Sequence, residues 1–166
     1  MPRIVDSFIS ELEHEAVTTR RVLERVPADK YDWKPHEKSY SLGALAFHVA
    51  NTPGVVAGIL AEDTFDYGSI AGDKTGEPSE LMAALDSSVA AAKEALNGWD
   101  DARAAALWKL VRDGEEIMAM PRIGMVRAIM LNHWYHHRGQ LTVYLRILNV
   151  PLPSVYGPSA DENPFA

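Results

Sequence analysis

The chain has 166 residues, of which 47% are hydrophobic and 23% are charged, and its formal net charge is -7 at neutral pH. This length suits one compact domain and is short for two. The absence of cysteine excludes disulfides, cysteine nucleophiles and thiolate metal sites, so any metal must be held by nitrogen and oxygen atoms. The acidic balance, with no basic run longer than Arg20 and Arg21, argues against a nucleic-acid partner.

Two further features bear on where the protein resides. No window reaches the roughly 18 uncharged apolar residues that a membrane span requires, so we expect a soluble protein without a membrane partner. The N-terminal stretch MPRIVDSFISELEHE carries acidic residues where a signal peptide would place its apolar ones. We therefore expect the protein to be cytoplasmic.

Apolar residues spaced three and four apart predict amphipathic helices in the first half of the chain. The first runs from Ile4 to Val26. After a connecting loop rich in Pro, Asp and Lys, Ser41 is a favourable N-cap for a second helix that extends to about Leu60. Residues 62–77 contain three glycines and no apolar stripe, which is typical of a mobile loop over a site.

The second half of the chain is predicted to contain two more helices separated by a hairpin. Pro78 is well placed to begin a third helix. Asp113 and Gly114 lie between short apolar runs and predict a small β-hairpin. The last helix covers about Ile123 to Leu148. We therefore predict an all-α fold: a four-helix bundle forming one domain over residues 1–166, with the small hairpin between the third and fourth helices.

The histidines give the clearest indication of chemistry. His133 and His137 are four residues apart on the last predicted helix, so their side chains project from one face with Cβ atoms about 6 Å apart. His48 lies on the apolar side of the second predicted helix and supplies a third candidate ligand. Three neutral imidazoles leave a coordination position open for water or substrate, as in catalytic zinc sites. His136 is rotated about 100° from His137 and is expected to be a bystander.

Other interpretations of these side chains remain open at this level. The three histidines could instead be core residues whose nitrogens are satisfied by carbonyls or carboxylates. Glu11 and His14 form half of a carboxylate-bridged di-iron motif, but the second half is missing, so His14 is expected to be solvated.

Several residues are candidates for supporting roles around such a metal. Glu11 and Glu15 could accept the second N–H of a metal-bound imidazole, although a solvated helix face is the simpler interpretation of both. Arg138 and Gln140 could orient a substrate, and a surface ion pair is the alternative use of Arg138. His36 lies in the first connecting loop and is expected to be exposed.

The sequence resembles the DinB-like superfamily of damage-inducible, YfiT-like proteins over nearly its whole length. The resemblance is carried by SLGALAFHVA with His48, by HWYHHRGQLTVYLR with His133 and His137, and by VPLPSVYGPSADE at residues 150–162. It implies a four-helix bundle, often dimeric, in which these three histidines bind a divalent metal such as zinc or nickel. Tyr156 and Asp161 belong to the same pattern, and we expect them to hold the C-terminal tail against the helices.

The resemblance also implies a range of activities. Some relatives are thiol transferases or isomerases that use a low-molecular-weight thiol, for which a metal would lower the pKa of the bound thiol. We therefore expect a metal-dependent enzyme acting on a small molecule by transfer or hydrolysis, working as a homodimer. The alternatives are a noncatalytic stress- or damage-inducible protein with a structural metal, and a DNA-damage effector that touches nucleic acid, which the low basic content disfavours.

Overall fold

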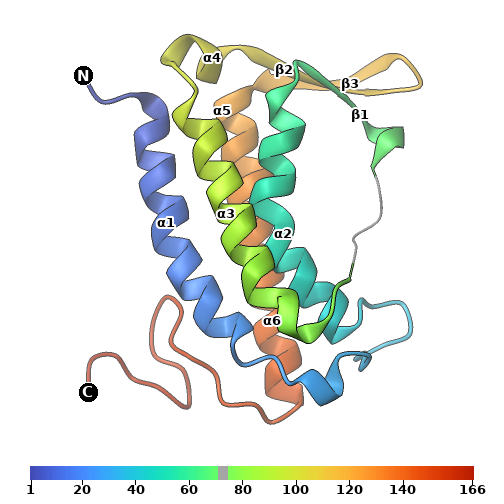
Figure 1. Ribbon diagram of the computed structural model, residues 1–166, viewed down its shortest axis with the longest axis vertical. Coiled ribbons are helices and arrows are strands. Elements are labelled where there is room, and N and C mark those ends of the chain that lie inside the picture. Colours follow the sequence, from blue (N-terminus) through green and yellow to red (C-terminus); the bar gives the residue numbers. More distant parts are fainter. Residues whose placement is uncertain (71–74) are drawn as a thin grey trace.

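The computed structural model describes residues 1–70 and 75–166, and these are mostly helical, as the apolar spacing predicts. The long helices run side by side along the long axis of the molecule (Figure 1). The helices are α1 (Ile4–Leu23), α2 (Leu42–Ala61), α3 (Leu81–Asn97), α4 (Asp101–Ala105), α5 (Arg122–Met125) and α6 (His133–Ile147), and single turns of 3-10 helix cover Ala28–Lys30, Tyr67–Ser69 and Pro78–Glu80.

The predicted helix boundaries agree with these to within a few residues. Ser41 is the N-cap of α2, and its side-chain oxygen accepts a hydrogen bond from the backbone N–H of Ala44 at 3.2 Å. The first helix ends three residues earlier than Val26, because a residue that precedes proline disfavours the helical conformation. Pro78 begins a 3-10 turn that leads into α3 rather than α3 itself.

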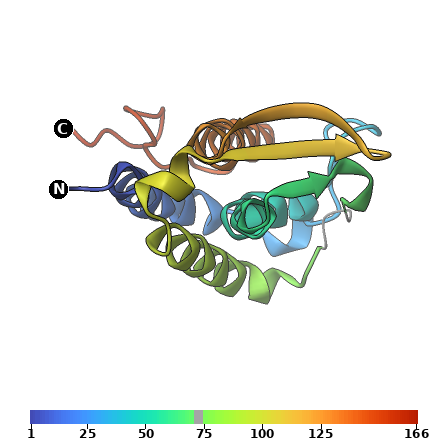
Figure 2. The same ribbon diagram turned by 90° about the horizontal axis from the view of Figure 1, so that it is seen from above.

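A small sheet lies across one end of the helices, and it extends past them on one side (Figure 2). Its strands are β1 (Thr64–Asp66), β2 (Leu107–Arg112) and β3 (Glu115–Pro121), in the order β1-β2-β3. The predicted hairpin is confirmed: β2 and β3 are antiparallel, and Asp113 and Gly114 both have positive φ, as a type I′ turn requires.

The structure differs from the predicted all-α fold with a small hairpin by one additional strand. β1 pairs in parallel with β2, from within the stretch that the sequence suggested was a structureless loop. A strand of three residues is too short to show an alternating apolar pattern, and its partner lies more than 40 residues away along the chain. Residues 71–74 of that predicted loop lie outside the described residues.

Helix α2 is the apolar centre of the molecule and packs against both α3 and α6. It contains an 18-residue window of mean hydropathy 1.5, long and apolar enough to cross a membrane, so the expectation that no such window exists is wrong. However, 56% of that window is buried inside the molecule. The core position of α2 explains its composition, and we interpret it as the core helix of a soluble protein.

Two side chains bind the carbonyl groups at the C-terminal end of α2. Arg122, which is fully buried, donates to the carbonyl oxygens of Leu60 at 3.2 Å and Glu62 at 3.0 Å. The indole N–H of Trp108 donates to the carbonyl of Ile59 at 3.3 Å. These carbonyls have no partner within the helix, and a cation is favourable at a helix C-terminus. The contacts fix the sheet and α5 to the end of α2.

The last predicted helix is continuous but not uniform. Between α5 and α6 the backbone is π-helical over Val126–Asn132, directly before His133. Such π-helical turns are rare in proteins, and those that do occur often lie at functional sites. Val126 and Met130 are buried in the core, whereas Ile129 is 39% exposed. The π segment therefore presents an isoleucine to the surface next to the first histidine of α6.

A buried polar cluster joins α6 to α1 and to the C-terminal tail. The Arg138 side chain, which is 2% exposed, contacts a Glu15 carboxylate oxygen at 2.6 Å and donates to the hydroxyl of Thr19 at 3.1 Å. Its other nitrogen donates to the Tyr156 hydroxyl at 2.6 Å, and that hydroxyl donates to Glu15 at 3.0 Å. The prediction of Arg138 as a surface ion pair or substrate contact is therefore wrong, whereas the anchoring role of Tyr156 is confirmed.

The tail has a second attachment at Asp161. Its carboxylate accepts the backbone N–H of Leu152 at 2.8 Å and pairs with Arg146 of α6. The predicted role of Asp161 in holding the tail is therefore also confirmed.

A second ion pair between α1 and the last helical segment lies nearer the surface. Arg127 donates two parallel hydrogen bonds to Glu11, at 2.8 and 2.6 Å, and the Tyr135 hydroxyl donates to the same carboxylate at 2.8 Å. These hydrogen bonds, with that from Arg127 the largest influence, hold the pKa of Glu11 below its ordinary value of 4.5. The pair stabilises the ionised form of Glu11.

Replacing Arg138 by Met is expected to lower the free energy of unfolding by about 3–5 kcal/mol, because Glu15 is then left buried without its cation. Urea denaturation of the variant measures this loss. Arg146→Met is the matched control on the same helix, since it removes the more exposed pair with Asp161, and its effect is expected to be much smaller. Equal losses in the two variants would contradict the importance of the buried cluster.

Glu11→Gln is expected to destabilise the protein by about 1 kcal/mol or less at pH 7, because the ion pair with Arg127 is partly exposed. A lowered folded-state pKa means that the unfolded chain binds more protons, so this stabilisation is complete above pH 4.5 and is lost as the pH falls through the lowered pKa. Denaturation of both proteins at pH 7 and near pH 3 measures the difference between their free energies of unfolding. A difference that is as large at pH 3 as at pH 7 would exclude a stabilising role for ionised Glu11.

Candidate metal centre

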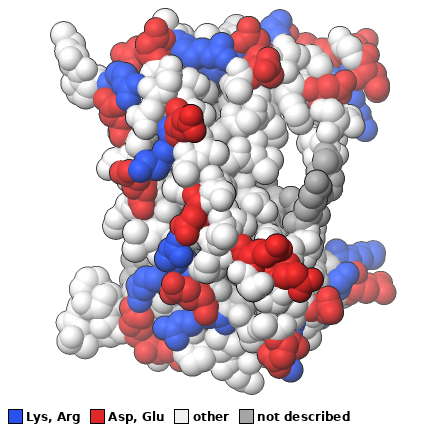
Figure 3. Space-filling model, viewed as in Figure 1, with Lys and Arg blue, Asp and Glu red and all other residues white. Residues whose placement is uncertain are grey.

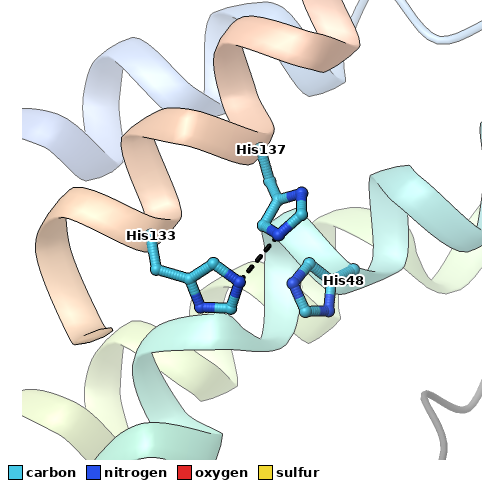
Figure 4. A group of neighbouring side chains, drawn as sticks. All are labelled: His48, His133 and His137. Carbon is cyan, nitrogen blue, oxygen red and sulfur yellow. Dashed lines mark hydrogen bonds between the residues drawn. The ribbon is translucent and has the colours of Figure 1, made fainter. Parts of the chain in front are cut away.

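Three histidine side chains from two helices point toward one another: His48 from α2, and His133 and His137 from α6 (Figure 4). The Nε2 atoms of His133 and His137 are 2.7 Å apart. The ring centre of His48 lies 4.3 Å from that of His137 and 5.2 Å from that of His133. The structure thus brings together the three histidines that the sequence singled out, while their role as metal ligands stays a prediction.

One hydrogen bond sets how α2 and α6 face each other at this point. Pro53 lies inside α2 and has no N–H, so the carbonyl of Val49 lacks its partner one turn later. The indole N–H of Trp134, which is fully buried, donates to that carbonyl at 2.7 Å instead. Val49 follows His48 and Trp134 follows His133 in the sequence. The contact therefore holds the two histidines opposite each other.

Neighbouring side chains orient the individual rings. The Nδ1 atom of His137 is 2.7 Å from the side-chain oxygen of Gln140. Since an amide oxygen can only accept, Nδ1 carries the proton and Nε2 is left as an acceptor that faces His133. The ring of Tyr40 stacks on His48 with the centroids 5.9 Å apart, and the hydroxyl of Thr52 donates to the His48 carbonyl at 2.6 Å.

The electrostatics of the site favour the neutral form of His137. Burial and, next in importance, the nearby His48 lower the pKa of His137 to about 4, and the hydrogen bond with Gln140 opposes this shift only in part. His137 is therefore uncharged at neutral pH. The neutral imidazole is the form that binds a metal ion, so no proton has to be removed from His137 first.

The donor set fits one divalent cation. One nitrogen from each of the three half-buried histidines lies within 4.8 Å of the other two. Zinc–nitrogen bonds are about 2.0–2.1 Å long, so small rotations of the side chains would let all three nitrogens share one ion. Nitrogen ligands suit zinc, nickel, copper and iron. Within the part of the chain that the structure describes, this is the one group of histidine, aspartate and glutamate side chains close enough to hold a metal.

The other candidate residues lie elsewhere or have different partners. Glu11 and Glu15 do not support the imidazoles, because Arg127 and Arg138 hold them on the α1 side of the last helix, and Glu15 is buried rather than solvated. The polar partner of His137 is Gln140, which the sequence suggested as a substrate contact. The sequence could not reveal the pairings with α1, because these residues lie more than 100 positions apart.

The remaining histidines match their predictions. His14 and His36 are exposed, so the di-iron alternative has no support at Glu11 and His14. His136 is also exposed and does not join the cluster, although its ring centre is 4.9 Å from that of His137. His136 is a bystander, as expected.

A pocket of about 440 Å³ opens beside the three histidines. This volume lies within the range of small-molecule sites. Tyr67 and Ile70 place the predicted loop region next to the site, and Asn51 and Val55 lie three and seven residues after His48, a helical spacing that could have indicated them from sequence. The residues that line the pocket are Tyr40, His48, Asn51, Thr52, Val55, Val56, Ile59, Tyr67, Ile70, Ile129, His133 and His137.

Comparisons with known proteins agree with this fold. The model of the DinB family matches residues 1–163. The uncharacterised protein YrdA of Bacillus subtilis (strain 168) is 24% identical over 98% of this chain and 93% of its own length. Among solved structures, a DinB-like protein from Bacillus cereus ATCC 10987 is similar with a TM-score of 0.71 at 20% identity, covering 94% of this chain and 100% of that one.

A DinB-like protein from Bacillus subtilis, YjoA, gives a TM-score of 0.69 at 18% identity and covers 90% of this chain and 97% of its own. At these identities the solved structures show a shared fold, and the family model, which matches nearly the whole chain, shows the relationship. The chain belongs to the DinB family.

Proposed function

We propose that His48, His133 and His137 bind one divalent cation, zinc or nickel, and that the protein is a metal-dependent enzyme of the thiol transferase or hydrolase type. The observation that carries this proposal is the convergence of three imidazoles from two helices on the wall of a pocket. A divalent cation held there supplies Lewis-acid chemistry that lowers the pKa of a bound thiol or water.

The residues of the chain have separate tasks in this proposal. Gln140 fixes the tautomer and the orientation of His137. Tyr40 stacks on one face of the His48 ring and also lines the pocket. Asn51 and Thr52 are polar groups on the same wall and can orient a small-molecule substrate.

The finer features expected of the family are part of the same proposal. We infer a four-helix bundle built from α1, α2, α3 and the helical segment that ends in α6, a cytoplasmic homodimer, and no nucleic-acid partner. The alternative function is a noncatalytic stress protein with a structural metal. A continuous apolar core that includes Leu45, Val49 and Leu141 favours the enzyme, because the helices pack without any contribution from a metal.

Protein purified without a histidine tag and loaded with zinc or nickel is expected to retain about one equivalent of metal per chain, measured by elemental analysis after desalting. His48→Ala is expected to lose most of this metal and to keep its helical circular dichroism. His136→Ala is the matched control, since it removes an exposed histidine next to His137. Loss of less than a quarter of the metal in His48→Ala would contradict the proposed ligand set.

The same samples distinguish the enzyme from the structural alternative. On the enzyme proposal the metal-free protein keeps its helical content, and metal raises its melting temperature only through preferential binding to the folded state. On the alternative, a chelator unfolds the helices. Circular dichroism with and without chelator reads out both outcomes.

Gln140→Leu is expected to weaken zinc affinity about tenfold, because His137 loses the acceptor that holds its Nδ1–H and directs Nε2 toward the site. Gln140 is exposed, so the fold should not change. Titration against a competing chelator measures the affinity. Gln140→Glu keeps an oxygen acceptor and should retain zinc binding, and equal weakening in both variants would exclude an orienting role for this side chain.

A further inference from the structure

The described part of the pocket beside the histidines differs from the rest of the molecule in its lack of charged side chains. Its described lining contains no Lys, Arg, Asp or Glu. The whole chain, in contrast, carries 23% charged residues. The polar groups of the wall, apart from the histidines, are the side chains of Asn51 and Thr52 and the phenols of Tyr40 and Tyr67. The hydroxyl of Thr52 already donates to the carbonyl of His48.

The remaining wall is aliphatic and partly open to water. Val55 is 57% exposed, Ile70 is 53% exposed and Ile129 is 39% exposed, and all three line the pocket. Grouped apolar side chains that stay exposed beside polar groups mark a binding surface, because a ligand with an apolar body removes them from water. The polar groups next to them then fix its orientation.

Three arginines of the neighbouring segments do not belong to the described lining of the pocket. Arg127 and Arg138, on the same helical segment as His133 and His137, pair with Glu11 and Glu15 of α1. Arg112 lies with its guanidinium 5.5 Å from the ring centre of Tyr67 and does not line the pocket. A carboxylate on a ligand would therefore lose water without gaining a cationic partner from the described wall.

Charged side chains are unevenly distributed over the face of the molecule that Figure 3 shows. In Figure 3 the charged side chains follow α1 and α3 and gather at both ends of the molecule, whereas the surface along the upper part of α2 is uncharged.

From these observations we propose that the pocket accepts an uncharged small molecule with an apolar body and one donor group, a thiol or hydroxyl, that reaches the histidine site. This inference rests on the proposed function, because the donor group is bound through the cation held by His48, His133 and His137. The aliphatic wall binds the body of the ligand, and the lack of cationic side chains in the described lining selects against ligands that carry carboxylates.

A matched pair of thiols tests this selectivity. The protein is loaded with cobalt, its metal content is measured, and it is titrated with benzyl mercaptan and with 4-(mercaptomethyl)benzoate, which differ by one carboxylate. Binding is followed by the charge-transfer absorption of the cobalt thiolate. We expect benzyl mercaptan to bind at least about tenfold more tightly, because the carboxylate must be desolvated without a partner.

Two valines of equal exposure provide the matched variants. Val55 lines the pocket on α2 and Val143 lies on α6 outside it, and each is 57% exposed. Val55→Lys adds a cation to the aliphatic wall, so it should weaken benzyl mercaptan and strengthen 4-(mercaptomethyl)benzoate, reversing the preference. Val143→Lys adds the same charge elsewhere and should leave both affinities within about twofold of the parent protein.

The outcomes separate this inference from the proposed function. Protein that retains no metal overturns both. If metal is retained but the two thiols bind equally well, or neither binds, the proposed selectivity is wrong and the metal site stands. If Val143→Lys changes the preference as much as Val55→Lys does, overall charge governs binding and the role of the pocket wall is excluded. A preference that only Val55→Lys reverses supports the inference.

Discussion

The hydrogen bond from the Trp134 indole to the carbonyl of Val49 determines how the two histidine-bearing helices meet. It exists because Pro53 cannot donate to that carbonyl, which leaves a strong acceptor in the centre of the core. A buried carbonyl without a partner would cost about 1–3 kcal/mol, so the pairing is strongly favoured. Since His48 precedes Val49 and His133 precedes Trp134, this hydrogen bond also places the two candidate ligands face to face.

The last helical segment has two sides with opposite electrostatic character. Toward α1, Arg127 and Arg138 are held by carboxylates, and the Arg138 cluster is buried. Toward α2, the same segment presents His133, the neutral His137 and an exposed isoleucine to a pocket whose described lining contains no Lys, Arg, Asp or Glu. Because the arginines are paired with α1, they are kept away from the imidazoles, where a cation would repel a bound metal. The structural ion pairs therefore leave the α2 side of this segment to the proposed metal site.

The π-helical stretch and the small sheet complete the pocket. The π segment ends at Asn132 and places Ile129 on the pocket wall just before His133. The pairing of β1 with β2 holds the start of the 64–70 segment, from which Tyr67 and Ile70 reach the same wall. Arg122 and Trp108 fix this end of the molecule to α2. Elements distant in the sequence thus contribute to one cavity.

Elements with local signals could be predicted from the amino-acid sequence: the helices from their apolar spacing, the hairpin from Asp113 and Gly114, and the histidine set from the i, i+4 pair and the apolar side of the second helix. The partners of these residues became known only from the folded chain. Arg138 is buried against Glu15, Gln140 rather than a glutamate orients His137, and β1 forms only because β2 lies beside it. The spacing of apolar residues indicates which side of a helix is buried. An ion pair or a strand pairing between distant segments has no such pattern in the sequence, because it depends on how the helices are rotated against each other in the folded core.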